Sequence, residues 1–414
     1  MRIVLVLIGA LLVGAYAPPS SCANTARQDA SLPADILFVT ALEPDSGPFS
    51  RDNLIVRIDA ATETATPFYA DPGALHLVPL RWSPQADRLL FYRTTHPAEK
   101  ELAAQLCILA KNGTLQGCLE DSPPVQGYYV EPPLATWSAD GQKVYFLREQ
   151  TNPSGECIRA LTEADATTGR TLRTLYETDC FTELVWSPSS ETAIVGTGDH
   201  WRTRYEHRTP THILDLQTGH TLFDLDTLVP EHAHPFSVSP QISPDGAYLI
   251  ASVFYDLRYD NPYGIHAQGA LPLRFLVDRR GRIHAVFGEP NGLPRMDVFG
   301  WGRDGQTLYF GHMENTLDCS GFGMEGRWRF YRYDIATGKL TPLYTDTACT
   351  IVTIRNTLRP SPDETALLFE FQPSGSRFGN MWHIALVSTE GAGLHFLTPA
   401  YPSVQYPIWS PPSP

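Results

Sequence analysis

The chain has 414 residues, of which 43% are hydrophobic and 18% are charged, so it can bury a large core. Its 35 prolines and 31 glycines are typical of many short strands joined by turns, and they argue against helical bundles and against disorder. The formal net charge of −14, without any cluster of Lys or Arg, argues against a nucleic-acid partner, because a phosphate backbone needs several converging cations.

Residues 1–21 are predicted to be an export signal, since Arg2 precedes an apolar stretch that runs from Ile3 to Ala17. Residues 22–33 would then be a short linker, followed by one domain over 34–414. Cys22 directly follows the signal and resembles the lipid-acceptor residue of bacterial lipoproteins, although Pro19-Ser20-Ser21 departs from their pattern. Ordinary signal-peptidase cleavage after Ala17 or Ala23 is the alternative, and both remain open.

A strand is predicted next over residues 36–40, and residues 54–64 predict a hairpin. One phrase then recurs along the chain: a Trp or its substitute, Ser-Pro-Asp-Gly or a variant, and an apolar strand. It begins at Trp82, Trp137, Trp186, Ile242, Trp301, Pro360 and Trp409. The central residues favour a tight turn. Each repeat therefore supplies one hairpin, with the Trp packed between adjacent sheets, and a second hairpin completes a four-stranded unit.

Six cysteines fall into neighbouring pairs that predict three disulfides: Cys107 with Cys118, Cys157 with Cys180, and Cys319 with Cys349. The first pair flanks an Asn112-Gly113 hairpin turn symmetrically, so its two members should face each other across the hairpin. Disulfides of this kind need an oxidising compartment, which indicates an exported protein of the cell envelope or one that is secreted.

The longest predicted loops carry aromatic residues and arginines, a combination that recognition surfaces favour. The candidate binding residues are Tyr128, Tyr129, Trp201, Arg202, Tyr205, Phe236, Tyr255, Arg258, Tyr259 and Tyr263. The alternative is that these side chains pack the loops onto the scaffold. His232 and His234 are spaced to reach one metal ion, but no third ligand is fixed by spacing, so solvated histidines are favoured and no cofactor is expected.

Catalytic motifs are not recognised. The chain has no Gly-x-Ser-x-Gly elbow, and the predicted disulfides would occupy the cysteines that could act as nucleophiles. Asp140, Asp245, Asp304 and Asp363 belong to the turn phrases, so their carboxylates are expected to cap backbone N–H groups.

The two ends of the chain predict the architecture. Residues 36–40 lack a preceding Trp-Ser-Pro strand, and residues 406–410 supply that strand at the other end. We therefore expect a seven-bladed β-propeller of four-stranded blades, closed by the C-terminal strand, with six or eight blades as the alternatives.

The Ser-Pro-Asp-Gly repeats resemble those of TolB-type, WD-repeat-like propellers, which also occur in tricorn-like and prolyl-oligopeptidase-like proteases. The resemblance implies the fold but no single activity. The favoured hypothesis is a monomeric, non-catalytic binding protein for a protein, peptide or glycan, which contacts a membrane only through a lipid on Cys22. The alternatives are a propeller hydrolase or lyase with a metal or carboxylate site at the central channel, and a regulatory partner of a separate peptidase.

Overall fold

The computed structural model describes residues 32–40, 53–95, 103–120, 135–151, 154–179, 182–187, 192–197, 212–215, 220–224, 227, 235–255, 272–288, 292–315, 326–373, 382–391, 393–397 and 404–410. All named elements in these residues are β-strands, and no helix in this part of the chain is long and apolar enough to cross a membrane. The predicted export signal and Cys22 lie outside the described residues.

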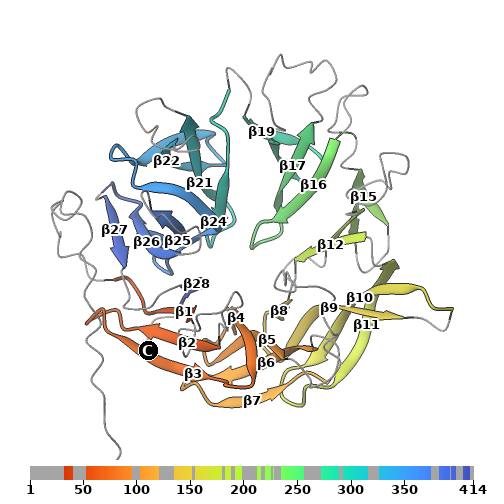
Figure 1. The fold of residues 1–414 in the computed structure, drawn as a ribbon. Helices are drawn as coiled ribbons and strands as arrows, with labels where there is room; N and C mark the ends of the chain where they lie inside the picture. Colours follow the sequence, from red (N-terminus) through yellow and green to blue (C-terminus); the bar gives the residue numbers. More distant parts are fainter. Residues whose placement is uncertain are drawn as a thin grey trace, which may run out of the picture.

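The described strands form seven sheets, each of four antiparallel strands, arranged around an axis (Figure 1). Each strand series below starts beside the axis and runs outward. Sheet 1 consists of β28 (Gln405–Trp409), β1 (Ile36–Thr40), β2 (Leu54–Ile58) and β3 (Ala65–Ala70). Sheet 2 consists of β4 (Ala74–Trp82), β5 (Arg88–Thr95), β6 (Ala103–Ala110) and β7 (Leu115–Cys118). Sheet 3 consists of β8 (Ala135–Trp137), β9 (Lys143–Thr151), β10 (Cys157–Asp165) and β11 (Thr171–Asp179).

The remaining sheets follow in chain order. Sheet 4 consists of β12 (Thr182–Ser187), β13 (Thr192–Thr197), β14 (His212–Asp215) and β15 (Thr221–Asp224). Sheet 5 consists of β16 (Pro235–Ile242), β17 (Tyr248–Tyr255), β18 (Pro272–Asp278) and β19 (Ile283–Phe287). Sheet 6 consists of β20 (Val298–Trp301), β21 (Thr307–Asn315), β22 (Gly326–Asp334) and β23 (Lys339–Thr345). Sheet 7 consists of β24 (Ile351–Pro360), β25 (Ala366–Pro373), β26 (His383–Ser388) and β27 (Leu394–Leu397). The predicted all-β propeller with four-stranded blades is confirmed.

The repeated Ser-Pro-Asp-Gly phrase forms a turn that satisfies its own polar groups. In sheet 3, the Ser138 hydroxyl donates to Oδ1 of Asp140 at 2.6 Å and accepts from the N–H of Lys143 at 2.9 Å. The same Asp140 oxygen accepts the N–H of Gln142 at 3.0 Å. Equivalent carboxylates cap the turns at Asp245, Asp304 and Asp363, so the predicted role of these four residues is confirmed.

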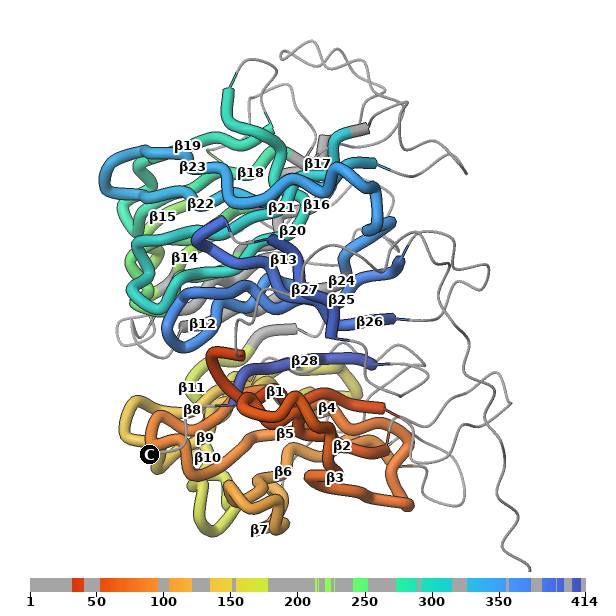
Figure 2. The backbone as a smooth tube through the Cα atoms, turned by 90° about the vertical axis from the view of Figure 1, so that its left-hand side faces the viewer, coloured from red at the N-terminus to blue at the C-terminus, as the bar shows by residue number. Residues whose placement is uncertain are grey.

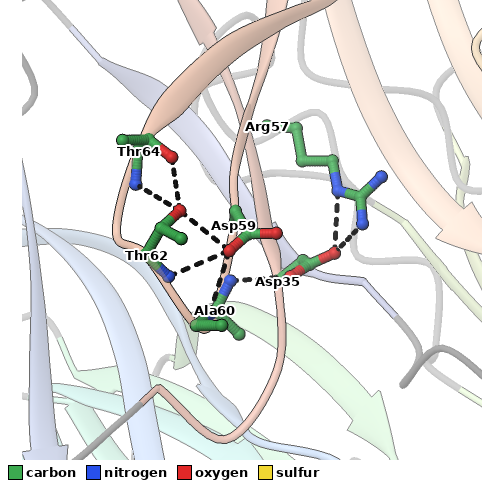
Figure 3. Close-up of polar contacts among 7 residues, drawn as sticks. Asp35, Arg57, Asp59, Ala60, Thr62 and Thr64 are labelled. Carbon is green, nitrogen blue, oxygen red and sulfur yellow. Dashed lines mark hydrogen bonds and ion pairs between the residues drawn. The ribbon is translucent and has the colours of Figure 1, made fainter.

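The second hairpin of a sheet is closed by a related device, which Figure 3 shows in sheet 1. Oδ1 of Asp59 accepts the N–H and the hydroxyl of Thr62, both at 2.9 Å. Beside it, Asp35 accepts the N–H of Ala60 at 2.7 Å and forms an ion pair with Arg57. An Asp followed by Thr three residues later is therefore the reason that this turn can stand in water without unpaired backbone groups.

Neighbouring sheets pack face to face through apolar side chains. One face of sheet 1, with Phe38 and Val56, packs against Leu368 and Ile384 of sheet 7. The opposite face packs against sheet 2, where Phe91 is fully buried. Sheet 1 is thus covered on both faces, by the sheet that follows it in the chain and by the last sheet of the chain.

The C-terminal strand completes sheet 1. Strand β28 pairs with β1 in antiparallel register, with Trp409 opposite Ile36 and Ile408 opposite Leu37 (Figure 1). The side chains of Ile408 and Trp409 are buried. A bulge interrupts this register, and within it Tyr406 has a φ of 53°, in the left-handed region that non-glycine residues rarely adopt.

The predicted disulfide between Cys107 and Cys118 is confirmed. The two residues face each other on β6 and β7, with their Cα atoms 3.9 Å apart. Cys157 and Cys349 are also disulfide-bonded. Their predicted partners, Cys180 and Cys319, lie outside the described residues.

Candidate functional site

The two faces of the propeller differ in how they connect the strands. Short links, such as the turns at residues 83–87 and 111–114, join the third and fourth strands of every sheet and the first and second strands of sheets 2 to 7. Because the strands alternate in direction, these turns lie on one face, which we call the turn face; Figure 2 shows several of them along one edge. The opposite ends of the strands define the connection face, and the links that leave from these ends include the long segments 119–134, 198–211 and 256–271.

The structure places two of the predicted binding residues beside the connection face. Phe236 lies near the start of β16 and Tyr255 ends β17, where Tyr255 pairs with Pro235. These ends adjoin the connections 225–234 and 256–271. The other candidates lie outside the described residues: Tyr128, Tyr129, Trp201, Arg202, Tyr205, Arg258, Tyr259 and Tyr263, together with His232 and His234.

A polar cluster that the sequence did not suggest lies at the same face, between sheets 5 and 6. Asp297, directly before β20, accepts the N–H of Met313 at 2.7 Å and pairs with Nε of Arg295 at 2.6 Å. Nδ1 of His312 lies 3.2 Å from Oδ2 of Asp297, the oxygen that also accepts the Met313 N–H. Burial opposes ionisation, but the hydrogen bonds from His312, Met313 and Arg295 outweigh it and hold the pKa of Asp297 below its ordinary value.

Arg274 extends this cluster from β18. Its guanidinium lies over the ring of Phe299, 4.9 Å from the ring centroid, and donates to the carbonyl oxygen of Asp297 at 3.2 Å. Burial lowers the pKa of Arg274 to about 10, although the charge of Asp297 acts in the opposite direction. The hydrogen bonds and ion pairs of this cluster therefore tie sheet 5 to sheet 6 at the connection face.

Two arginines on axial strands differ from the Asp297 cluster because their guanidinium groups have no partner among the described residues. Arg81 on β4 and Arg359 on β24 occupy the same position of the repeat, directly before the Trp or its substitute. Strands β4 and β24 are the axial strands of sheets 2 and 7, on either side of sheet 1 (Figure 1). We call these two residues the axial arginine pair. Their guanidinium groups have no hydrogen bond or ion pair with any described residue.

The backbone of each axial arginine is fixed by the next sheet of the ring. The indole N–H of Trp137 donates to the carbonyl oxygen of Arg81 at 3.1 Å. In the same way, the indole N–H of Trp409 donates to the carbonyl oxygen of Arg359 at 2.7 Å. The repeated Trp thus holds the backbones of both arginines at equivalent places on axial strands.

The two axial arginines influence each other through their charges. Burial lowers the pKa of Arg359 to about 10; the charge of Glu370 opposes this shift, and the positive charge of Arg81 adds to it. Burial also lowers the pKa of Arg81. Yet the Arg81 side chain is exposed to solvent. Protein therefore encloses the Arg81 side chain on most sides, while water reaches it from one direction.

Glu370 and Tyr406 complete the surroundings of the axial arginine pair. Glu370 on β25 is buried, and its Oε1 accepts the N–H of Tyr406 at 2.5 Å. The positive φ of Tyr406 turns this N–H from β1 toward sheet 7, and its side chain packs with Leu80 against the core between sheets 2 and 3. The strained residue therefore links all three sheets around the pair.

Metal ligands do not gather in the part of the chain that the structure describes. No group of three or more His, Cys, Asp or Glu side chains in it could hold an ion. The described residues instead offer hydrogen-bond donors and positive charge at the axis, together with the Asp297 cluster at the connection face.

Comparison with known proteins identifies relatives only at the level of fold. No family model and no curated protein matches the chain. Among solved structures, it is similar to TolB from Acinetobacter baumannii, with 14% identity, 92% of this chain and 68% of TolB covered, and a TM-score of 0.45. It is also similar to an oligogalacturonate lyase in complex with manganese (14% identity, 81% and 82% covered, TM-score 0.48). A third similar structure is the S511A mutant of puromycin hydrolase (14% identity, 90% and 53% covered, TM-score 0.49). The described sheets themselves identify the chain as a β-propeller, and TolB, the lyase and the hydrolase are structures to which it is similar.

Proposed function

We propose that this protein is an exported, non-catalytic β-propeller that binds a protein, peptide or glycan through its connection face. The Cys107–Cys118 disulfide supports an oxidising compartment. The observation that carries the proposal is the difference between the faces. One face consists of tight turns that satisfy their own hydrogen bonds, and the other consists of long connections set on rigid strands.

A rigid scaffold is part of the proposal. We infer that β28 closes a seven-bladed ring, because it pairs with β1 while sheet 1 packs on sheets 2 and 7. Closure of this kind removes an exposed sheet edge and fixes the connections relative to one another. Long loops that are held on a rigid scaffold are the usual location of binding residues.

The proposal is tested by capture of partners from envelope extracts with the immobilised protein. Trp201→Ala and Tyr259→Ala alter predicted binding residues in the long connections. Phe396→Ala is the matched aromatic control, because Phe396 is 38% exposed on β27 at the circumference of the ring. We expect the first two variants to lose a partner that the wild type and the control retain, at unchanged melting temperature.

Equal capture by all four proteins would overturn the assignment to the connection face. Turnover of a substrate by the purified protein would overturn the non-catalytic part of the proposal while leaving the face in place.

A further inference from the structure

We propose that the axial arginine pair, Arg81 and Arg359, is an anion-binding site that takes a carboxylate group of an acidic peptide. This inference goes beyond the proposed function, because Arg81 and Arg359 closely precede turns of the turn face and so lie at the opposite end of the axis from the connection face.

The geometry of the pair is that of a site rather than of a scaffold contact. Two residues 278 positions apart in the chain (359 minus 81) reach the axis from sheets that flank sheet 1. Both backbones are held by indole N–H groups, so the approach of the side chains is built into the fold. Each guanidinium carries five donors in a planar fork, which matches the two oxygens of a carboxylate.

Neither guanidinium of the axial arginine pair forms an ion pair with a described residue. Several other described arginines have a carboxylate partner, as Arg93 has Asp71 at 2.8 Å and Arg159 has Glu149 at 2.5 Å. In the axial pair, two positive charges instead act on each other. Like charges that are partly withdrawn from water cost stability unless an anion joins them.

Solvent exposure gives a ligand access to the site. Arg81 is exposed although protein surrounds it on most sides. Gly300, which occupies the repeat position of the arginines in sheet 6, keeps the neighbouring backbone close, because a Cβ there would lie 1.9 Å from the carbonyl oxygen of Leu358. Leu358 directly precedes Arg359, so this contact fixes where β24 presents its arginine.

The charge of the surroundings favours a carboxylate over a dianion. Buried Glu370 acts on Arg359 and offsets part of the positive charge. The chain as a whole has a formal net charge of −14, which repels polyanions at a distance. A single carboxylate on a peptide matches the remaining positive charge, and a phosphate dianion does not.

The test is isothermal titration calorimetry at low ionic strength, with the full chain and two capped peptides, acetyl-Ala-Glu-Ala-amide and acetyl-Ala-Gln-Ala-amide. The wild type is expected to bind the Glu peptide at least about tenfold more tightly than the Gln peptide. Arg81→Gln and Arg359→Gln should each remove that difference. Arg280→Gln makes the same change of charge at an exposed turn of sheet 5 and should leave it intact.

Three results would overturn the inference. The Glu and Gln peptides could bind the wild type equally, the Arg81 and Arg359 variants could bind the Glu peptide as well as the wild type does, or inorganic phosphate could displace the peptide with higher affinity. None of them touches partner capture through Trp201 and Tyr259, so failure of the axial site and failure of the connection face are separate outcomes. Melting temperatures of all variants show whether a loss of binding reflects a loss of fold.

Discussion

The turn face and the ring axis treat polar groups in opposite ways. At the turn face, Ser138 and Asp140 bond to each other and to the backbone of their own turn, so nothing is left for a ligand. At the axis, Arg81 and Arg359 share their surroundings with one buried carboxylate, Glu370. Buried or half-buried polar groups in a scaffold are normally paired. The contrast therefore separates residues that maintain the fold from residues that stand ready for a partner.

The largest effect is expected from removal of β28, which supplies the axial strand between the two arginines. Deletion of residues 405–414 leaves β1 without its partner and removes Ile408 and Trp409 from the core. Truncation of one buried Trp side chain alone costs about 3–5 kcal/mol. We expect the deletion to abolish cooperative thermal unfolding, as followed by circular dichroism.

Deletion of residues 411–414 alone keeps β28 and serves as the control, with a melting temperature like that of the wild type. If the longer deletion melted at the same temperature as the control, β28 would not be part of a stable ring.

A smaller loss of stability is expected at the turn face. Ser361 is fully buried; its hydroxyl donates to Asp363 at 2.6 Å and accepts the N–H of Ala366 at 3.0 Å. Ser361→Ala leaves that N–H without an acceptor and should lower the free energy of unfolding in urea by about 1–3 kcal/mol. Ser388→Ala, at the other turn of sheet 7, is the control, with an expected change within about 0.5 kcal/mol. Equal effects would mean that the repeated Ser has no special role.

Features that depend on neighbouring residues or on the repeat could be predicted from the sequence. The repeated phrase predicts the tight turns, the four-stranded units, the position of Trp between sheets and the Cys107–Cys118 bond, because each depends on residues close together in the chain or on a repeat. The Asp297 cluster could not be predicted, since Arg274, Asp297 and His312 come from three different strand ends. The axial pair left one signal, an Arg directly before the Trp position in two repeats, but only the packing of sheet 1 between sheets 2 and 7 relates residue 81 to residue 359.

The turn carboxylates predict a modest dependence of stability on pH. A hydrogen bond from Ser138 lowers the pKa of Asp140, and hydrogen bonds from Thr337 lower the pKa of Asp334. A lowered pKa in the folded state stabilises the fold above the unfolded value of about 4, and this contribution is lost as the pH falls through the folded value. Melting temperatures should therefore fall below about pH 4 in the wild type. The fall should be less steep in Asp140→Asn and Asp334→Asn, and identical profiles would contradict the capping role.

The most direct measurement for the axis is the urea unfolding of Arg359→Gln without any ligand. If the axial arginine pair is kept for binding, removal of Arg359 relieves its repulsion with Arg81 while it removes its attraction to Glu370, so the variant should be about as stable as the wild type. A clear loss of stability in Arg359→Gln, comparable to that of Ser361→Ala, would show that the arginine holds the scaffold together and would contradict a ligand site on the axis.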